Sequence, residues 1–292
     1  TGQYWSGNPN YGDLEAITFQ GTNYNTFTNN YIHGWTHASS GASDAYTAIL
    51  GDTNAPHCEQ CTFEYNLIED ADGTNGGDSG EATYGLGGMI AYNVIHDTSN
   101  GILLNGAAVV HDNYVYNINQ SFDSGSHENG LETNDQDGPD YIYNNVFANL
   151  TAVSMFLGGY PYPINVWNNV IYPGPNANSP QLEARDASWS GLWANNTVYD
   201  SKSQNCFVQV GSGSINLTLA NNHCISSAGL STNAYTTKTN LVESPSQADA
   251  NASPHFDQYT SSKTCMLSPV AATNSTVGAG TNLTSSWPSG YS

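Results

Sequence analysis

The stretch Ala91-Tyr92-Asn93-Val94-Ile95-His96-Asp97 decides the fold, because close copies of it recur along the chain. In each copy an asparagine is followed, two positions later, by Ile, Val, Phe or Cys. The shared asparagine falls at eight positions, 20 to 36 residues apart: Asn30, Asn66, Asn93, Asn113, Asn145, Asn169, Asn196 and Asn222. A repeat of this length predicts stacked units, each of which buries its apolar face against its neighbours.

The repeats have the chemistry of strands and turns. They are short, rich in β-branched and aromatic residues, and bounded by Gly, Asn, Asp and Pro. No window carries a sustained apolar stripe at helical spacing, so helical repeats are not expected. An interval of 20 residues suits one coil of three short strands, and a longer interval suits the same coil with an inserted loop.

From about residue 14 to about residue 226, these repeats resemble the right-handed parallel β-helix proteins of the pectate-lyase-like superfamily. The resemblance implies an all-β fold, a single-stranded right-handed parallel β-helix (solenoid) of about eight to ten coils, with loop insertions on the N-terminal half. In that family asparagines stack in a column at one bend. Asn suits this place because it tolerates the left-handed conformation and its amide can bond along a ladder. We expect the β-helix over residues 1–235 and a closing segment over residues 236–292 that covers the last coil.

The composition restricts the partners. With 25 acidic and 4 basic residues the formal charge is −21, which repels nucleic acid and anionic membranes. No stretch reaches the roughly 18 apolar residues of a membrane span. The chain begins at Thr1 without a signal peptide, as expected for a mature secreted form.

The five cysteines weakly indicate an oxidising compartment. Cys58 and Cys61 are close enough for a local bridge, while the pairing of Cys206, Cys224 and Cys265 stays open. Seven glycosylation sequons would be used only if the source organism glycosylates: Asn119, Asn149, Asn195, Asn216, Asn251, Asn274 and Asn282.

One column of the aligned repeats carries candidate catalytic residues. The residue after the apolar position is His33, Glu69 and His96 on three consecutive coils, and the next column contains Asp70 and Asp97. Coils lie about 4.8 Å apart, so these side chains should be neighbours and could act as acids and bases. Two carboxylates on adjacent coils are also what glycoside hydrolysis needs. The alternative is an ordinary hydrogen-bonded ladder at the strand ends.

A second candidate is an acidic loop with the spacing of a calcium site. Oxygen ligands for Ca²⁺ would come from Asp70, Asp72, Asp78 and Glu81. The loop departs from the calcium pattern at Thr74 and Asn75, and the alternative is a solvated acidic loop.

A third candidate pair is Glu132 and Asp135, which replace Leu103 and Gly106 of the preceding coil. Glu183 falls in the column of Glu132 two coils later, which favours a plain outward position. Many β-helix polysaccharide lyases use Lys or Arg as base, and this chain has four basic residues, none within the acidic loops, so lyase chemistry is disfavoured.

These features predict a secreted protein that binds or cleaves an extracellular, neutral polysaccharide, with a carboxylate-based glycoside hydrolase activity. Abundant Tyr and Trp favour a sugar partner, because flat aromatic faces stack on sugar rings. The alternative is a structural extracellular protein without catalysis, such as an adhesin, surface-layer or filament subunit, which could associate through its coil ends or sides. The sequence leaves open whether the chain is an enzyme.

Overall fold

The structure is a computed structural model. It describes residues 17–18, 23–33, 47–51, 58, 60–69, 81–118, 128–133, 138–158, 161–172, 181–185, 190–200, 204–210, 216–231, 235–253, 268–269 and 280–283. Nearly all regular structure in this part is β. The predictions for Asp70, Asp72, Asp78, Asp135, Asn119 and Asn274 lie outside the described residues.

The strands form two long sheets. A 15-stranded sheet, here called sheet A, contains β1 (Ile17–Thr18), β2 (Thr26–Thr28), β4 (Thr47–Leu50), β5 (Thr62–Glu64), β7 (Glu81–Ala91), β9 (Ile102–His111), β11 (Leu131–Thr133), β12 (Asp140–Tyr143), β14 (Met155–Leu157), β15 (Ile164–Trp167), β17 (Leu182–Arg185), β18 (Ser190–Ala194), β20 (Phe207–Val210), β21 (Asn216–Ala220) and β23 (Tyr235–Lys238). A nine-stranded sheet, here called sheet B, contains β3 (Tyr31–His33), β6 (Leu67–Glu69), β8 (Val94–His96), β10 (Tyr114–Tyr116), β13 (Val146–Ala148), β16 (Val170–Tyr172), β19 (Thr197–Tyr199), β22 (His223–Ile225) and β24 (Leu241–Glu243).

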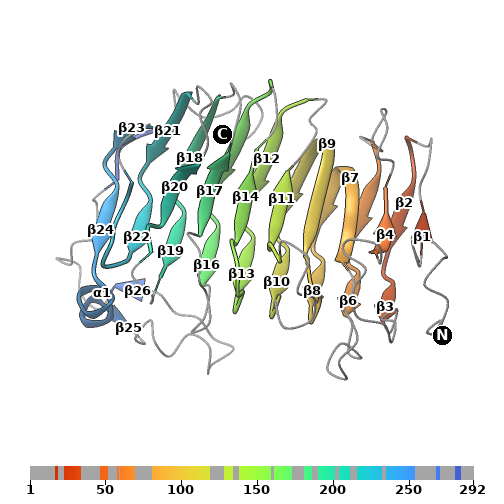
Figure 1. Cartoon of the computed structure of the whole chain (residues 1–292), viewed down its shortest axis with the longest axis horizontal. Helices are drawn as coiled ribbons and strands as arrows, with labels where there is room; N and C mark the ends of the chain where they lie inside the picture. The colour runs from red at the N-terminus through yellow and green to blue at the C-terminus, as the bar shows by residue number, and fades with distance from the viewer. Residues whose placement is uncertain are drawn as a thin grey trace.

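The chain passes repeatedly from sheet A to sheet B, and every pairing within these two sheets is parallel. In sheet B, β3 pairs with β6, β6 with β8 and β8 with β10. Figure 1 shows the strands side by side along the long axis in chain order, from β1 to β23 and β24. This arrangement is compatible with the expected parallel β-helix.

Sheet A itself bends into two walls. The long strand β9 pairs with β11 through its first residues and with β12 through its last ones. The pairing of its neighbour β7 with β9 shifts register between Thr83 and Leu86 and again between Leu86 and Gly88, so it is irregular where the sheet bends. Together with sheet B, the fold therefore has three walls.

A continuous asparagine ladder joins the coils between sheet A and sheet B, as expected. In each step one asparagine donates from its backbone N and from its Nδ2 to the Oδ1 of the next, at 2.9–3.1 Å. The ladder contains the eight predicted asparagines and one more, Asn240. Because these amides are largely buried, their hydrogen bonds fix the register between coils.

The left-handed conformation falls on the residue before each ladder asparagine. This corrects the expectation that the same asparagine adopts the left-handed conformation and also forms the hydrogen bonds of the ladder. Positive φ values of 49–58° occur at Asn29, Tyr65, Tyr92, Asp112, Asn144, Asn168, Asn195, Asn221 and Thr239. The first residue of each pair thus turns the chain, and the second bonds to the neighbouring coils.

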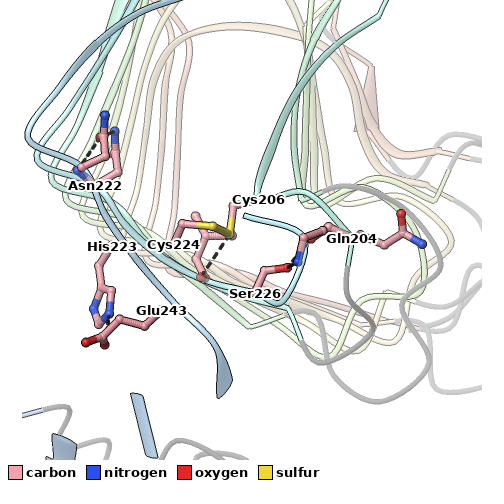
Figure 2. Close-up of a disulfide and its surroundings, with 10 residues drawn as sticks. Gln204, Cys206, Asn222, His223, Cys224, Ser226 and Glu243 are labelled. Carbon is pink, nitrogen blue, oxygen red and sulfur yellow. Dashed lines mark hydrogen bonds and ion pairs between the residues drawn. A yellow bond between two sulfur atoms is a disulfide. The ribbon is translucent and has the colours of Figure 1, made fainter. Parts of the chain in front are cut away.

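The core consists of inward columns of side chains, for example Ile68, Ile95, Val115 and Phe147 from sheet B. Cys224 continues this column and forms a disulfide with Cys206, with their Cα atoms 5.8 Å apart. Figure 2 shows this bond between the walls, with the neighbouring His223 pointing to the other face. A second disulfide joins Cys58 and Cys61, as the spacing suggested.

Both sheets continue past residue 235. There β23 pairs with β21, and β24 with β22. Helix α1 (Pro245–Asn251) follows, capped by reciprocal bonds between Ser244 and Gln247. Its Ala248 packs on Tyr172, Tyr199 and Ile225, so α1 covers this end of the outer face of sheet B. The short strands β25 (Ala252–Ser253) and β26 (Ser268–Pro269) form an antiparallel pair. The division into two units at residue 235 stays a prediction.

Candidate functional site

The strongest candidate site lies on the outer face of sheet B, near the N-terminal end of the stack. We call its five residues, Tyr31, Glu69, His96, Asp97 and Asn117, the acid–histidine cluster. The strand register confirms that His33, Glu69, His96 and Tyr116 share one column. They point away from the core because the middle residue of each three-residue strand points inward.

Glu69 and Asp97 hold the two ring nitrogens of His96 between them. Nε2 of His96 lies 3.1 Å from Oε2 of Glu69, and Nδ1 lies 2.6 Å from Oδ2 of Asp97. The backbone turns left-handed at Asp97, with φ of 53°, immediately after β8. This turn brings the Asp97 carboxylate back onto the ring of the preceding residue.

Neighbouring coils extend this chain of polar contacts. Tyr31 donates its phenol to Oε1 of Glu69, and Asn117 donates its Nδ2 to Oδ1 of Asp97. The hydrogen bond to Glu69 is the first cause of a raised pKa at Tyr31, followed by desolvation and by the charge of Glu69. The phenol is therefore held in its protonated, donating form.

The arrangement is suited to proton transfer. A neutral imidazole has one N–H and one lone pair, yet both nitrogens of His96 face carboxylate oxygens. An imidazole placed in this way can relay a proton between the two carboxylates. The side chains of Glu69 and Asp97 are 20% and 33% exposed, so both carboxylates are open to solvent.

Aromatic rings surround the cluster. His33 stacks on Tyr31 with centroids 4.3 Å apart, and Tyr116 stacks on His96 at 4.6 Å. Tyr114 in turn stacks on Tyr116. Desolvation, followed by the charge of Asp97, raises the pKa of Tyr116. Tyr31 and Tyr114 stay 55% and 43% exposed, so part of this aromatic surface is open to solvent.

A second His–Asp pair, His111 and Asp112, lies where sheet A ends and the bend with the asparagine ladder begins. This pair was not predicted from the sequence. Nδ1 of His111 lies 2.7 Å from Oδ2 of Asp112, which is also left-handed. Its Nε2, however, lies 3.1 Å from Sδ of Met89 instead of a carboxylate. The repeated His-Asp dipeptide is the signal for both pairs. A histidine followed by a left-handed aspartate is thus a local turn feature, and the Glu69 contact distinguishes His96.

Tyr31 and Tyr114 were also missed as members of this face. Each precedes a column residue by two positions, Tyr31 before His33 and Tyr114 before Tyr116. Residues two apart on a strand share a face, so the signal was present in the sequence.

Glu132 does not join the cluster, because it lies on β11 in sheet A. It is 6% exposed and accepts from Nδ2 of Asn129 at 2.9 Å. In its column, Phe156 lies between Glu132 and Glu183, as the aligned repeats predicted. The Arg185 guanidinium carbon lies 3.9 Å from the Phe156 ring centroid, and Arg185 Nε lies 3.5 Å from Oε1 of Glu183.

The calcium prediction stays a prediction. Glu81 is described, is 2% exposed and accepts from Nδ2 of Asn100 at 2.8 Å. Within the described ranges, no three His, Cys, Asp or Glu side chains form a group that could hold a metal ion.

Four of the sequon asparagines are exposed in the described part: Asn149, Asn195, Asn216 and Asn282. Asn251 ends α1. Their use stays a prediction.

Comparison of the chain with protein-family models, with curated proteins and with solved structures gave no match. Among the described residues, no helix has the length and apolar character needed to cross a membrane.

Proposed function

We propose that the chain is a secreted, right-handed parallel β-helix of about eight to ten coils, related to the pectate-lyase-like proteins. We propose further that it cleaves an extracellular polysaccharide as a glycoside hydrolase through the acid–histidine cluster. The contact of His96 with two carboxylates carries this proposal.

Glycoside hydrolysis needs one group that protonates the leaving oxygen and a second that activates water or attacks the sugar. Glu69 and Asp97 are separated by one imidazole ring, and both are partly exposed. We assign the basic role to one of these two carboxylates in its ionised form, and the acidic role to the other in its protonated form. His96 moves the proton between them.

The charge of the chain indicates the kind of substrate. A formal charge of −21 disfavours an acidic polysaccharide unless cations intervene, so a neutral polysaccharide is preferred. The two disulfides in the described part support an extracellular location, because such bonds persist in oxidising compartments.

The test is release of reducing ends from a panel of neutral and acidic polysaccharides, with and without Ca²⁺. Glu69→Gln should lower the rate at least about 100-fold, the usual contribution of general acid–base catalysis. His111→Ala is the matched control, because it removes a histidine with the same local aspartate but no second carboxylate, and it should keep most of the activity. The proposal fails if the folded protein releases no reducing ends from the whole panel. That outcome favours the structural, non-catalytic alternative.

A further inference from the structure

We propose that copies of this chain associate head to tail, with the last coil of one copy stacked on the first coil of the next, so that the asparagine ladder continues across the junction. This inference rests on the two ends of the stack and is independent of the proposed activity.

The asparagine ladder has a direction. At every described step the backbone N and the Nδ2 of one asparagine donate to the Oδ1 of the next asparagine along the chain. In return, the residue after that next asparagine donates its backbone N to the carbonyl of the first, as Leu67 does to Asn30 and Leu241 to Asn222. Donors and acceptors therefore alternate in a fixed order from coil to coil.

This direction leaves complementary groups at the two ends. Among the described residues, nothing donates to Oδ1 of Asn30 at the first coil, and nothing accepts from the backbone N of Asn240 at the last. If a second copy follows the same geometry, Asn240 of one copy donates to Asn30 of the next. The new junction then reproduces a step that already occurs eight times within the chain.

The side chains at the two ends are also complementary. Val242 occupies the inward column of sheet B and is 46% exposed, whereas Val198 and Cys224 in the same column are 0% exposed. Continuing the register would place Ile32 of the next copy, which is itself only partly buried, over Val242. The last coil therefore presents an apolar residue that no further coil covers in the described part of the chain.

The charges at the ends fit the same register. Glu243 would lie beside His33 of the next copy, as Glu69 lies beside His96 within the chain. Lys238 would lie beside Thr28, with Glu64 one coil further along the same column. Lys238 is one of only four basic residues, and across the junction it would lie two coils, about 10 Å, from an acidic side chain.

A head-to-tail contact is favoured over a symmetric one. Two last coils facing each other would bring two Asn240 backbone N–H groups together, and two first coils would bring two Asn30 Oδ1 atoms together, so neither symmetric contact continues the asparagine ladder. A head-to-tail contact does not close on itself unless the copies form a ring, so open chains of copies are expected. The formal charge of −21 opposes association, and salt screens this repulsion.

The test measures the mass of the full chain by sedimentation velocity over a range of protein concentration and salt, with electron microscopy of the same samples. The wild type should form linear assemblies whose mass grows with both variables. Val242→Asp should weaken association at least about tenfold, because it buries an unpaired charge at the junction. Val210→Asp is the matched control: Val210 is 39% exposed, but it lies in the outward column of Arg185, so association should persist.

A mixing experiment separates loss of the junction from loss of folding. Val242→Asp keeps an intact first coil, so adding it to wild type should shorten the assemblies by ending them. The proposal is overturned if the wild type stays monomeric at every concentration and salt, if Val210→Asp weakens association as much as Val242→Asp, or if added Val242→Asp leaves the assemblies unchanged. Reducing-end release is measured separately, so failure of this proposal and of the proposed hydrolase activity can be told apart.

Discussion

Replacing Asn145 by alanine should destabilise the fold far more than replacing its neighbour Asn144. Asn145 is fully buried, and its Oδ1 accepts from the backbone N and the Nδ2 of Asn113 at 3.0 and 2.9 Å. Its Nδ2 donates to the carbonyl of Val110, at 2.9 Å, among other acceptors. The alanine variant leaves the Asn113 amide and the Val110 carbonyl buried without these partners. Each such group costs about 1–3 kcal/mol, so we expect a loss of about 3 kcal/mol or more in the free energy of unfolding.

Asn144 is the matched control in the same dipeptide. It is exposed and left-handed, with φ of 55°. Alanine is disfavoured in that conformation by about 1 kcal/mol, and glycine is not. Asn144→Ala should therefore cost about 1 kcal/mol, and Asn144→Gly should be nearly neutral.

The assay is urea unfolding followed by circular dichroism, with midpoint and slope compared among the three variants and the wild type. An equal or larger loss for Asn144→Ala than for Asn145→Ala would show that stability depends on the turn and not on the ladder.

Three further predictions concern other parts of the fold. Replacing Cys206 and Cys224 together by alanine should lower the free energy of unfolding by about 3 kcal/mol, because this disulfide joins residues 18 positions apart. Replacing Cys58 and Cys61 by alanine should lower it less, because these residues are 3 positions apart. Thermal unfolding of the two double variants measures both losses. Burial lowers the pKa of His223 below its ordinary value of 6.5, although the contact with Glu243 acts to raise it. As the pH falls, the histidine of the unfolded chain therefore binds a proton before that of the folded chain does. The free energy of unfolding should consequently decrease as the pH drops below about 6.5. His223→Gln should flatten this slope in unfolding curves measured from pH 5 to 7, and an unchanged slope would exclude His223 as its source. The Tyr31 phenol should have a pKa above 10.0, measured as the difference between absorbance titrations of the wild type and Tyr31→Phe. Glu69→Gln should lower this pKa again. An unchanged pKa in that variant would show that Glu69 is not the partner of Tyr31 in solution.

Periodicity in the sequence was sufficient to predict the stacking and its register. Once the ladder asparagines are aligned, His33, Glu69 and His96 must share a column, and the strand pairs confirm it. The same alignment placed Glu132 opposite Leu103. A fixed repeat position therefore carries information about contacts between residues far apart in the chain.

Other features could not be read from the repeat. The left-handed residue before each ladder asparagine varies in type, as Tyr65, Asp112 and Thr239 show, so no shared letter marks its conformation. Asn240 was assigned to the closing segment because the residues around it change character there. The Cys206–Cys224 pairing depends on how the intervening chain folds back, which the spacing alone does not determine.

From the sequence, Asp97 was expected only to lie near His96, without a specific contact between the two side chains. The geometry of that contact depends on the left-handed turn that brings a carboxylate back onto the ring before it. Likewise, the His-Asp dipeptide alone does not separate His96 from His111, although the repeat alignment places only His96 in the column of Glu69. The structure separates them through what lies at Nε2, Glu69 in one case and Met89 in the other.

Catalysis by the acid–histidine cluster can be tested by comparing two glutamates, one on each sheet, on whichever polysaccharide the panel identifies. The rate of reducing-end release is measured for wild type, Glu69→Gln and Glu132→Gln, with each variant first shown to be folded. Glu69 contacts His96 on sheet B, and Glu132 lies on sheet A. We expect a loss of at least about 100-fold for Glu69→Gln and a rate close to wild type for Glu132→Gln. A wild-type rate for Glu69→Gln, or a large loss confined to Glu132→Gln, would contradict this expectation and place the chemistry on the other sheet.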